Sequence, residues 1–216
     1  MLPKPFAVLL LAALTAVAAE MPLPGLRIEP TGGGSIFYVK NNATVALTGY
    51  LIELVDYPGS SYSFWQDETI AEPIAPQGEK RIQVTNMTVG AVPDYVKMQA
   101  AVYAGGATAG IPEKVTQLLD RRRAVFDTTR QLIARIEKAG KEGTPKSALI
   151  GDLKQWADTM QPQGRANRNS PAAINQAAAG MAIGTTVARL DAQSQEETLA
   201  LLRGWERALA ANTPAK

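Results

Sequence analysis

Residue preferences change abruptly near Gly105 to Gly110, and this change limits the folds that the chain can adopt. Before Gly110 the sequence is rich in Tyr, Val, Ile, Thr and Gly, whereas Ala, Leu, Gln, Arg and Glu dominate after it. β-Branched and aromatic residues favour strands, and long unbranched side chains favour helices. The charge balance shifts at the same place, from five basic and nine acidic residues over 20–110 to 16 and 11 over 111–216. We therefore expect an α+β protein with a boundary in this glycine-rich stretch.

Residues 20–110 form short apolar segments of the kind that build an antiparallel sandwich. Turn residues separate these segments: the glycines at 32–34, Asn41-Asn42, the Pro-Gly-Ser-Ser run at 58–61 and Pro76-Gln77-Gly78. In the last segment, alternation is expected to place four apolar residues on one face: Val96, Met98, Ala100 and Val102. Six or seven short strands at this spacing predict two packed sheets.

The segment 45–57 breaks its alternation once. Apolar residues occupy odd positions up to Leu47, Val45 included, and even positions from Tyr50 on. A β-bulge adds one residue to a strand and shifts which face its side chains take. We therefore expect a bulge at Thr48-Gly49, which would bring both sets of apolar residues to the same face.

Three segments carry a family resemblance: Phe37-Tyr38-Val39-Lys40-Asn41-Asn42, Tyr50-Leu51-Ile52-Glu53-Leu54-Val55-Asp56, and Ile74-Ala75-Pro76-Gln77-Gly78-Glu79-Lys80. Their order resembles that of the bacterial immunoglobulin-like or fibronectin-like accessory domains of the FxLYD type. In those domains a strand ending in paired asparagines precedes a long strand, and a Pro-x-Gly-Glu turn opens the next. The resemblance spans roughly residues 35–103 and implies an immunoglobulin-like β-sandwich with a noncatalytic role. It does not extend to the second half of the chain.

The second half predicts a long helix and a small bundle. Pro112 suits a first helical position, apolar residues recur at intervals of three and four up to Ile136, and Gly140 is expected to end the helix. We expect a long connecting helix over 111–140 and a C-terminal helical bundle over 141–216. Its helices start at Thr144-Pro145, Ser170-Pro171 and Ser194, where Glu197 completes a capping box. The helix after Ser170 is expected to bury one row of residues: Ile174, Ala178, Met181, Thr185 and Ala188.

Residues 1–19 have the order of a cleavable signal peptide. Lys4 precedes an apolar run from Phe6 to Val17, and small residues follow up to Ala19. The run is shorter than the roughly 20 residues that a membrane-spanning helix needs. We therefore expect cleavage near Ala18 or Ala19, export to the periplasm or the medium, and no transmembrane segment in the mature chain.

The chain contains neither cysteine nor histidine. This composition excludes thiol catalysis, cysteine or histidine metal sites and Ser-His-Asp nucleophile systems. Carboxylate-pair glycoside hydrolysis, a Ser-Lys arrangement and an all-oxygen calcium site stay open, but none shows its sequence signature. We expect no metal, no cofactor and no enzymatic activity.

The candidate binding residues are four aromatics, Tyr57, Tyr62, Phe64 and Trp65, around the turn at 58–61. Aromatic, serine and glycine residues in one loop are typical of a recognition surface, and Tyr62 is expected to be exposed at its tip. The alternative is that Phe64 and Trp65 form the core of the sandwich.

Two clusters of charged residues are further candidates for a site. Two of the three acids Asp67, Glu68 and Glu72 could supply a carboxylate pair for glycoside hydrolysis, although acidic loop residues are usually solvated. The Arg121-Arg122-Arg123 run spreads over about 200° of a helix. We therefore interpret it as a solvated helix face, with Arg122 reaching Phe126 or a carboxylate, and expect no nucleic-acid partner.

These observations favour an exported, non-enzymatic interaction module of the bacterial envelope that binds a protein or an envelope component. The alternative is a carbohydrate-binding or carbohydrate-active protein that uses the aromatic loop and its neighbouring carboxylates.

The leader sequence makes a direct prediction. Mass spectrometry of the protein recovered from the periplasm or the medium should show a new N-terminus at Ala19 or Glu20, because the small residues that a signal peptidase needs end there. An intact Met1 in that fraction would contradict the prediction.

Overall fold

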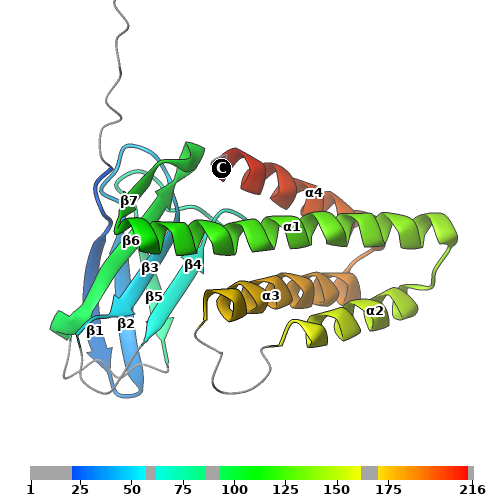
Figure 1. Ribbon diagram of the computed structural model, residues 1–216, viewed down its shortest axis with the longest axis horizontal. Helices are drawn as coiled ribbons and strands as arrows, with labels where there is room; N and C mark the ends of the chain where they lie inside the picture. The colour runs from blue at the N-terminus through cyan, green and yellow to red at the C-terminus, as the bar shows by residue number, and fades with distance from the viewer. Residues whose placement is uncertain (1–20, 57–61, 86–92, 162–169, 214–216) are drawn as a thin grey trace, which may run out of the picture.

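The computed structural model describes residues 21–56, 62–85, 93–161 and 170–213. Two antiparallel sheets at the N-terminal side are followed by four helices, one of them long (Figure 1). The expected α+β class, with a strand region followed by a long helix and a bundle, is confirmed.

Seven strands form the two sheets. The first sheet has the order β1-β2-β5, made of Gly25–Thr31, Gly34–Lys40 and Glu79–Val84. The second has the order β4-β3-β6-β7, made of Ser63–Asp67, Leu47–Leu54, Val96–Tyr103 and Thr108–Gly110. Two short 3-10 turns, Pro93–Tyr95 and Ala104–Gly106, flank β6.

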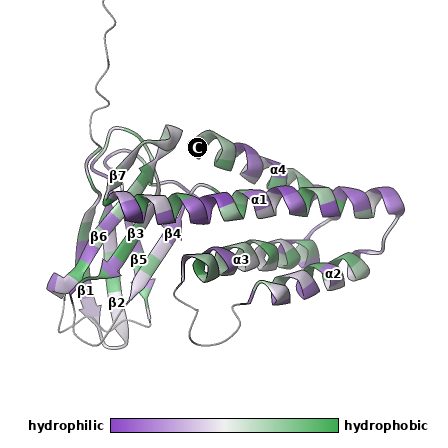
Figure 2. Cartoon of the chain, viewed as in Figure 1, coloured by the Kyte–Doolittle hydropathy of each residue, from purple (hydrophilic) through white to green (hydrophobic). Residues whose placement is uncertain are grey.

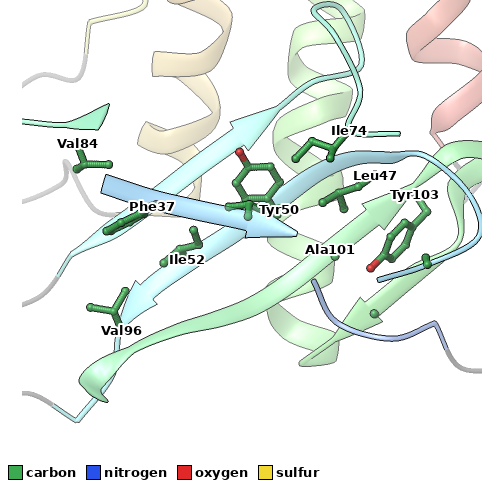
Figure 3. Packing of buried hydrophobic residues seen from close by; sticks show 12 residues of the cluster. Phe37, Leu47, Tyr50, Ile52, Ile74, Val84, Val96, Ala101 and Tyr103 are labelled. Atoms are coloured by element: carbon green, nitrogen blue, oxygen red, sulfur yellow. The ribbon is translucent and has the colours of Figure 1, made fainter. Parts of the chain in front are cut away.

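The two sheets enclose a hydrophobic core (Figure 3). Phe37 of β2, Tyr50 and Ile52 of β3 and Tyr103 of β6 belong to this core, and none of these side chains is exposed to solvent. Full burial of side chains of this size contributes roughly 1.5–3 kcal/mol each. The strand half therefore has a core of its own.

Two β-bulges shape the central strands. The predicted one is present: Leu47 pairs with Tyr103 and Gly49 with Val102, so Thr48 is the extra residue. It brings Tyr50 and Ile52 into the core together with Leu47, whereas Val45 precedes the strand and is 36% exposed.

The second bulge corrects the expected face of β6. Leu51 pairs with Ala100 and Ile52 with Met98, which leaves Gln99 as the extra residue. Because of this shift, Val96 and Met98 contact the core between the sheets, whereas Ala100 and Val102 lie on the opposite face. The four residues therefore do not share one face.

The helices are α1 (Pro112–Glu142), α2 (Lys146–Thr159), α3 (Pro171–Ala192) and α4 (Gln195–Asn212). Helix α1 ends later than predicted, because Gly140 stays helical and Gly143 takes the left-handed conformation with φ 66°. Glycine adopts this conformation without steric cost, which makes it the usual residue at such a helix end.

Helix α1 packs in both halves of the protein. Near its start, Leu118 and Leu119 cover Leu51 and Val102 on the outer face of the four-stranded sheet. Further along, Leu132 and Ile136 of α1 join a second core. The other helices contribute Leu153, Ile183, Leu190 and Leu202 to it. Figure 2 shows hydrophilic and hydrophobic residues interspersed along α1, as expected for a helix with a buried face.

Helix α3 buries only part of the predicted row: Ala178 is buried and Ile174 is half-buried. Met181 is 66% exposed, and Thr185 and Ala188 are exposed as well. The fully buried positions lie one or two residues later, at Ile183 and Leu190. Alanine and glycine occur all round this helix, so the sequence pattern did not define one apolar face.

Within the described parts of the chain, no helix combines the length and the apolar character that crossing a membrane requires.

The capping box predicted at α4 is present and makes a stability prediction. Ser194 Oγ accepts a hydrogen bond from the Glu197 backbone N–H at 3.1 Å. Ser194→Ala should lower the free energy of unfolding by about 1 kcal/mol, measured by urea denaturation, because the helix loses its N-cap. Ser147→Ala, at an exposed position in the first turn of α2, is the control and should change it little.

The stabilisation that Ser194 gives through Glu197 should depend on pH. Hydrogen bonds from Ser194 lower the pKa of Glu197. A carboxylate with a lowered pKa in the folded state stabilises the fold above its unfolded pKa, and this stabilisation is lost as the pH falls. The difference between the wild type and Ser194→Ala should therefore shrink below pH 4.5, and an unchanged difference would contradict the role of Glu197.

Candidate functional site

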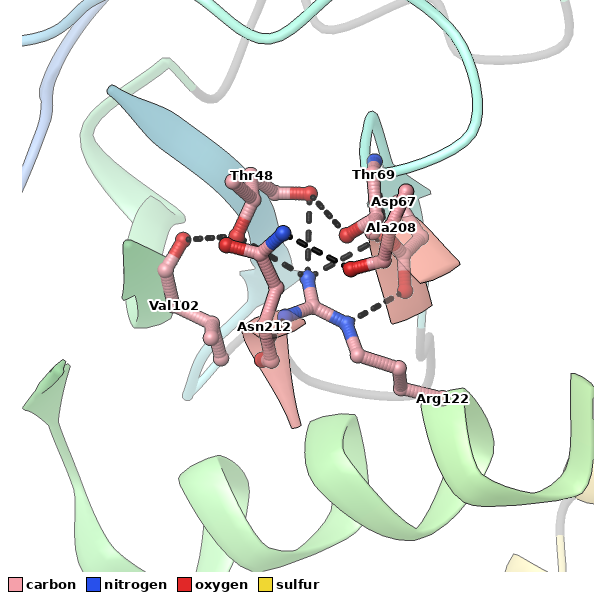
Figure 4. Close-up of polar contacts among 7 residues, drawn as sticks. All are labelled: Thr48, Asp67, Thr69, Val102, Arg122, Ala208 and Asn212. Atoms are coloured by element: carbon pink, nitrogen blue, oxygen red, sulfur yellow. Dashed lines mark hydrogen bonds and ion pairs between the residues drawn. The ribbon is translucent and has the colours of Figure 1, made fainter. Parts of the chain in front are cut away.

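A buried arginine in α1, Arg122, connects this helix to the four-stranded sheet and to the C-terminal end of α4. The Arg122 side chain has no exposed surface, and its Nε and Nη2 donate to the two carboxylate oxygens of Asp67 at 2.8 and 3.1 Å. Its Nη1 donates to the backbone oxygen of Asn212 at 2.8 Å, at the C-terminal end of α4 (Figure 4). Cations stabilise such helix ends, where carbonyl groups have no partner within the helix.

The predicted bulge supplies the remaining acceptors. Arg122 Nη2 also donates to the backbone oxygen of Thr48 at 3.0 Å and to its Oγ1 at 3.2 Å. The extra residue of a bulge is left out of the strand ladder, so its carbonyl is available to other donors. Every nitrogen of the guanidinium therefore has an acceptor, which buried charges require.

This network corrects the expectation that Arg121-Arg122-Arg123 is a solvated helix face. Arg123 is partly exposed and pairs with Asp120 at 2.7 Å. Arg122 is fully buried. It reaches a carboxylate, as expected, and this carboxylate is Asp67 of β4. Only part of the run therefore faces solvent.

A crevice of about 180 Å³ lies beside this network, between the four-stranded sheet and the helices. Its lining comes from four elements and the segment after β4: Trp65, Gln66, Asp67, Ile70, Arg121, Val125, Ala178, Met181, Ala182, Thr185, Trp205 and Leu209. Most of these residues are apolar, and two are tryptophans from different halves of the protein. The exposed residues Met181 and Thr185 of α3 connect the crevice to solvent.

Arg121 brings a positive charge into this crevice. Its Nη1 atom is buried and has no hydrogen-bond partner among the described residues. Its guanidinium lies over the ring of Trp65, with 5.6 Å between Cζ and the ring centroid. Burial lowers the pKa of Arg121, and the charge of Asp67 opposes this shift.

The four predicted aromatic residues do not form one surface in the structure. Tyr57 lies outside the described residues. The ring of Phe64 packs edge-on against Phe37 at 6.0 Å, and Tyr62 is half-buried against the same core, so it is not the exposed tip expected. Burial raises the pKa of Tyr62. Trp65 points to the opposite face and lines the crevice, because successive residues of a strand alternate between faces.

The neighbouring carboxylates are not simply solvated. Glu68 is fully buried, with its Oε1 2.6 Å from Lys80 Nζ and accepting a hydrogen bond from Tyr50 OH at 3.4 Å. Burial, and after it the charge of Glu68, raise the pKa of Tyr50. Asp67 is held by Arg122, and only Glu72 is exposed, as expected for a loop acid.

In the described residues no group of three or more acidic side chains could hold a metal ion. Comparison of the chain with protein-family models, with curated proteins and with solved structures found no match. The resemblance to FxLYD-type domains therefore stays a prediction.

Sequence reasoning missed Arg121 and Trp205 as parts of a site. The arginine run was noticed, but nothing local indicates that two of its members turn inward. Trp205 lies in α4, far from Trp65 in the sequence, and only the fold brings both residues to the crevice.

The close approach of β3 to Arg122 makes a prediction. A Cβ atom on Gly49 would lie 2.7 Å from Arg122 Nη2, too near for a guanidinium held by five hydrogen bonds. Gly49→Ala should therefore lower the free energy of unfolding by about 1 to 3 kcal/mol, the usual cost of overpacking, measured by urea denaturation.

The matched control is Gly151→Ala in α2. Gly151 is exposed in the helix and has open space where a Cβ would be. This substitution should raise the free energy of unfolding by about 0.5 to 1 kcal/mol, because alanine is the better helix former. If both variants are equally stable, Gly49 is not required for the Arg122 network.

Proposed function

We propose that this chain is an exported, non-enzymatic binding module of the bacterial envelope that holds its ligand, part of a protein or of another envelope component, in the crevice. The observation that carries the proposal is the crevice itself, an apolar hollow lined by two tryptophans and by an arginine whose buried nitrogen lacks a partner among the described residues. Binding sites for small groups are usually preformed, concave and mostly apolar, with a few polar groups that fix orientation.

The position of the crevice supports a binding role. It lies between elements that Arg122 holds together, since β4, α1 and α4 each contribute both to that network and to the lining. Sites whose walls are fixed by buried contacts lose little entropy when a ligand enters.

The chemistry of the residues supports a role without catalysis. The chain has no histidine or cysteine, the side chains that most often act as general base or nucleophile near neutral pH. Among the described residues that line the crevice, Asp67 is the one carboxylate, and its two oxygens already accept hydrogen bonds from Arg122.

The carbohydrate alternative keeps one supporting feature, the ring of Trp65. Of its three proposed carboxylates, Asp67 and Glu68 are engaged in ion pairs, and Glu72 is exposed outside the crevice lining. We therefore place the binding site at the crevice and not at the loop of Tyr57 to Trp65.

A capture experiment with the mature protein tests the proposal. Thr185→Trp should fill the crevice from its exposed side, whereas Ala188→Trp adds the same ring to an exposed position of α3 outside the lining. Envelope extract is passed over the wild type and both variants, and the retained components are identified by mass spectrometry. We expect one component to be retained, chemically unchanged, by the wild type and Ala188→Trp and lost by Thr185→Trp.

A third variant, Tyr62→Ala, tests whether the component binds in the crevice or at the loop of Tyr57 to Trp65. If Tyr62→Ala loses the component and Thr185→Trp retains it, the loop is the site. If the component is released in cleaved form, the chain is an enzyme, and if no component is enriched over a blank column, the proposed binding role is wrong.

A further inference from the structure

The crevice has an uncompensated positive charge. Of the described lining residues, two are charged, Arg121 and Asp67, and Asp67 is the bidentate partner of the fully buried Arg122. One carboxylate therefore faces two guanidinium groups. Among the residues outside the described ranges, 57–61, 86–92, 162–169 and 214–216 contain no Asp or Glu, and 1–20 contains one, Glu20.

An arginine in such a place favours an anion. A partly desolvated charge interacts more strongly than a charge in bulk water, because the surrounding dielectric constant is lower. The cation–π contact with Trp65 fixes the guanidinium over one ring face, and a guanidinium presents its N–H donors in a planar fork that matches a carboxylate.

The size and lining of the crevice limit the rest of the ligand. An apolar cavity of about 150 Å³ is enough to hold a benzene molecule. The crevice offers about 180 Å³, with Trp65, Val125, Trp205 and Leu209 among its walls. This space accommodates one ring, or an alkyl chain of similar volume, together with a small charged group.

We propose that the crevice binds a small free carboxylic acid, with its carboxylate on Arg121 and its apolar body, about the size of one aromatic ring, against the tryptophan-lined walls. The inference rests on the proposed function, since it names the ligand class of the same site. A monoanion matches the single excess charge. A phosphate monoester, which carries close to two charges at neutral pH, would leave negative charge unpaired in an apolar space.

The experiment uses benzoate as the probe, titrated into the mature protein with tryptophan fluorescence and calorimetry as readouts. Benzamide has the same ring without the charge, and acetate has the charge without the ring. We expect benzoate to bind at least tenfold more tightly than either, because each control removes one of the two recognised features.

Arg121→Met tests the role of the arginine while keeping a long apolar side chain. It should weaken benzoate binding tenfold or more and leave benzamide binding unchanged, whereas Arg121→Lys should retain part of the preference for benzoate. Arg123→Met is the matched control, because Arg123 pairs with Asp120 and does not line the crevice. Fluorescence spectra and melting curves of each variant establish that it is folded.

Three results would overturn the inference: equal binding of benzoate and benzamide, full benzoate binding by Arg121→Met, or tighter binding of a peptide that ends in a phenylalanine carboxylate. The last result would assign the site to a polypeptide terminus. Failure here is distinguishable from failure of the proposed function, because loss of captured component by Thr185→Trp does not depend on benzoate.

Discussion

The ion pair between Arg122 and Asp67 is the interaction on which the arrangement of the two halves depends. Burying a guanidinium costs several kcal/mol unless geometry and hydrogen bonds compensate, and removing one partner of a buried pair typically destabilises a protein by about 3 to 5 kcal/mol. Here the compensation comes from three places far apart in sequence: the bulge at Thr48, the end of β4 and the last turn of α4. The network is complete only when the sheet, α1 and α4 are docked together.

The same ion pair accounts for the character of the crevice. Asp67 is the one acidic residue in the lining as far as the structure describes the chain, and both of its oxygens accept hydrogen bonds from Arg122. Arg121, the preceding residue of the helix, lies on the crevice side, where it contacts the ring of Trp65 and is attracted by the charge of Asp67. A structural requirement of the junction thus leaves the adjacent site with a positive charge, which connects the stability of the fold to its chemistry.

Local patterns predicted more of the fold than of the site. The change of parity at Leu47 and Tyr50 revealed the first bulge, because it moves apolar residues between odd and even positions. The second bulge, at Gln99, gave no such signal, since apolar residues occur on both sides of it at Met98, Ala100 and Ala101. Arg121 and Arg122 could not be assigned, because their environments depend on β4 and α4, which reach them only through tertiary packing.

The composition boundary near Gly110 does not coincide with a boundary in the packing. Leu118 and Leu119 cover the outer face of the four-stranded sheet, and Leu132 and Ile136 of the same helix belong to the bundle core. Helix α1 therefore contributes to both cores and, with the Arg122 network, links their positions. Trp65 of β4 and Trp205 of α4 both line the crevice. A ligand that contacts both can bind only the docked form, and by linkage it must stabilise that form over any in which α4 has left the sheet.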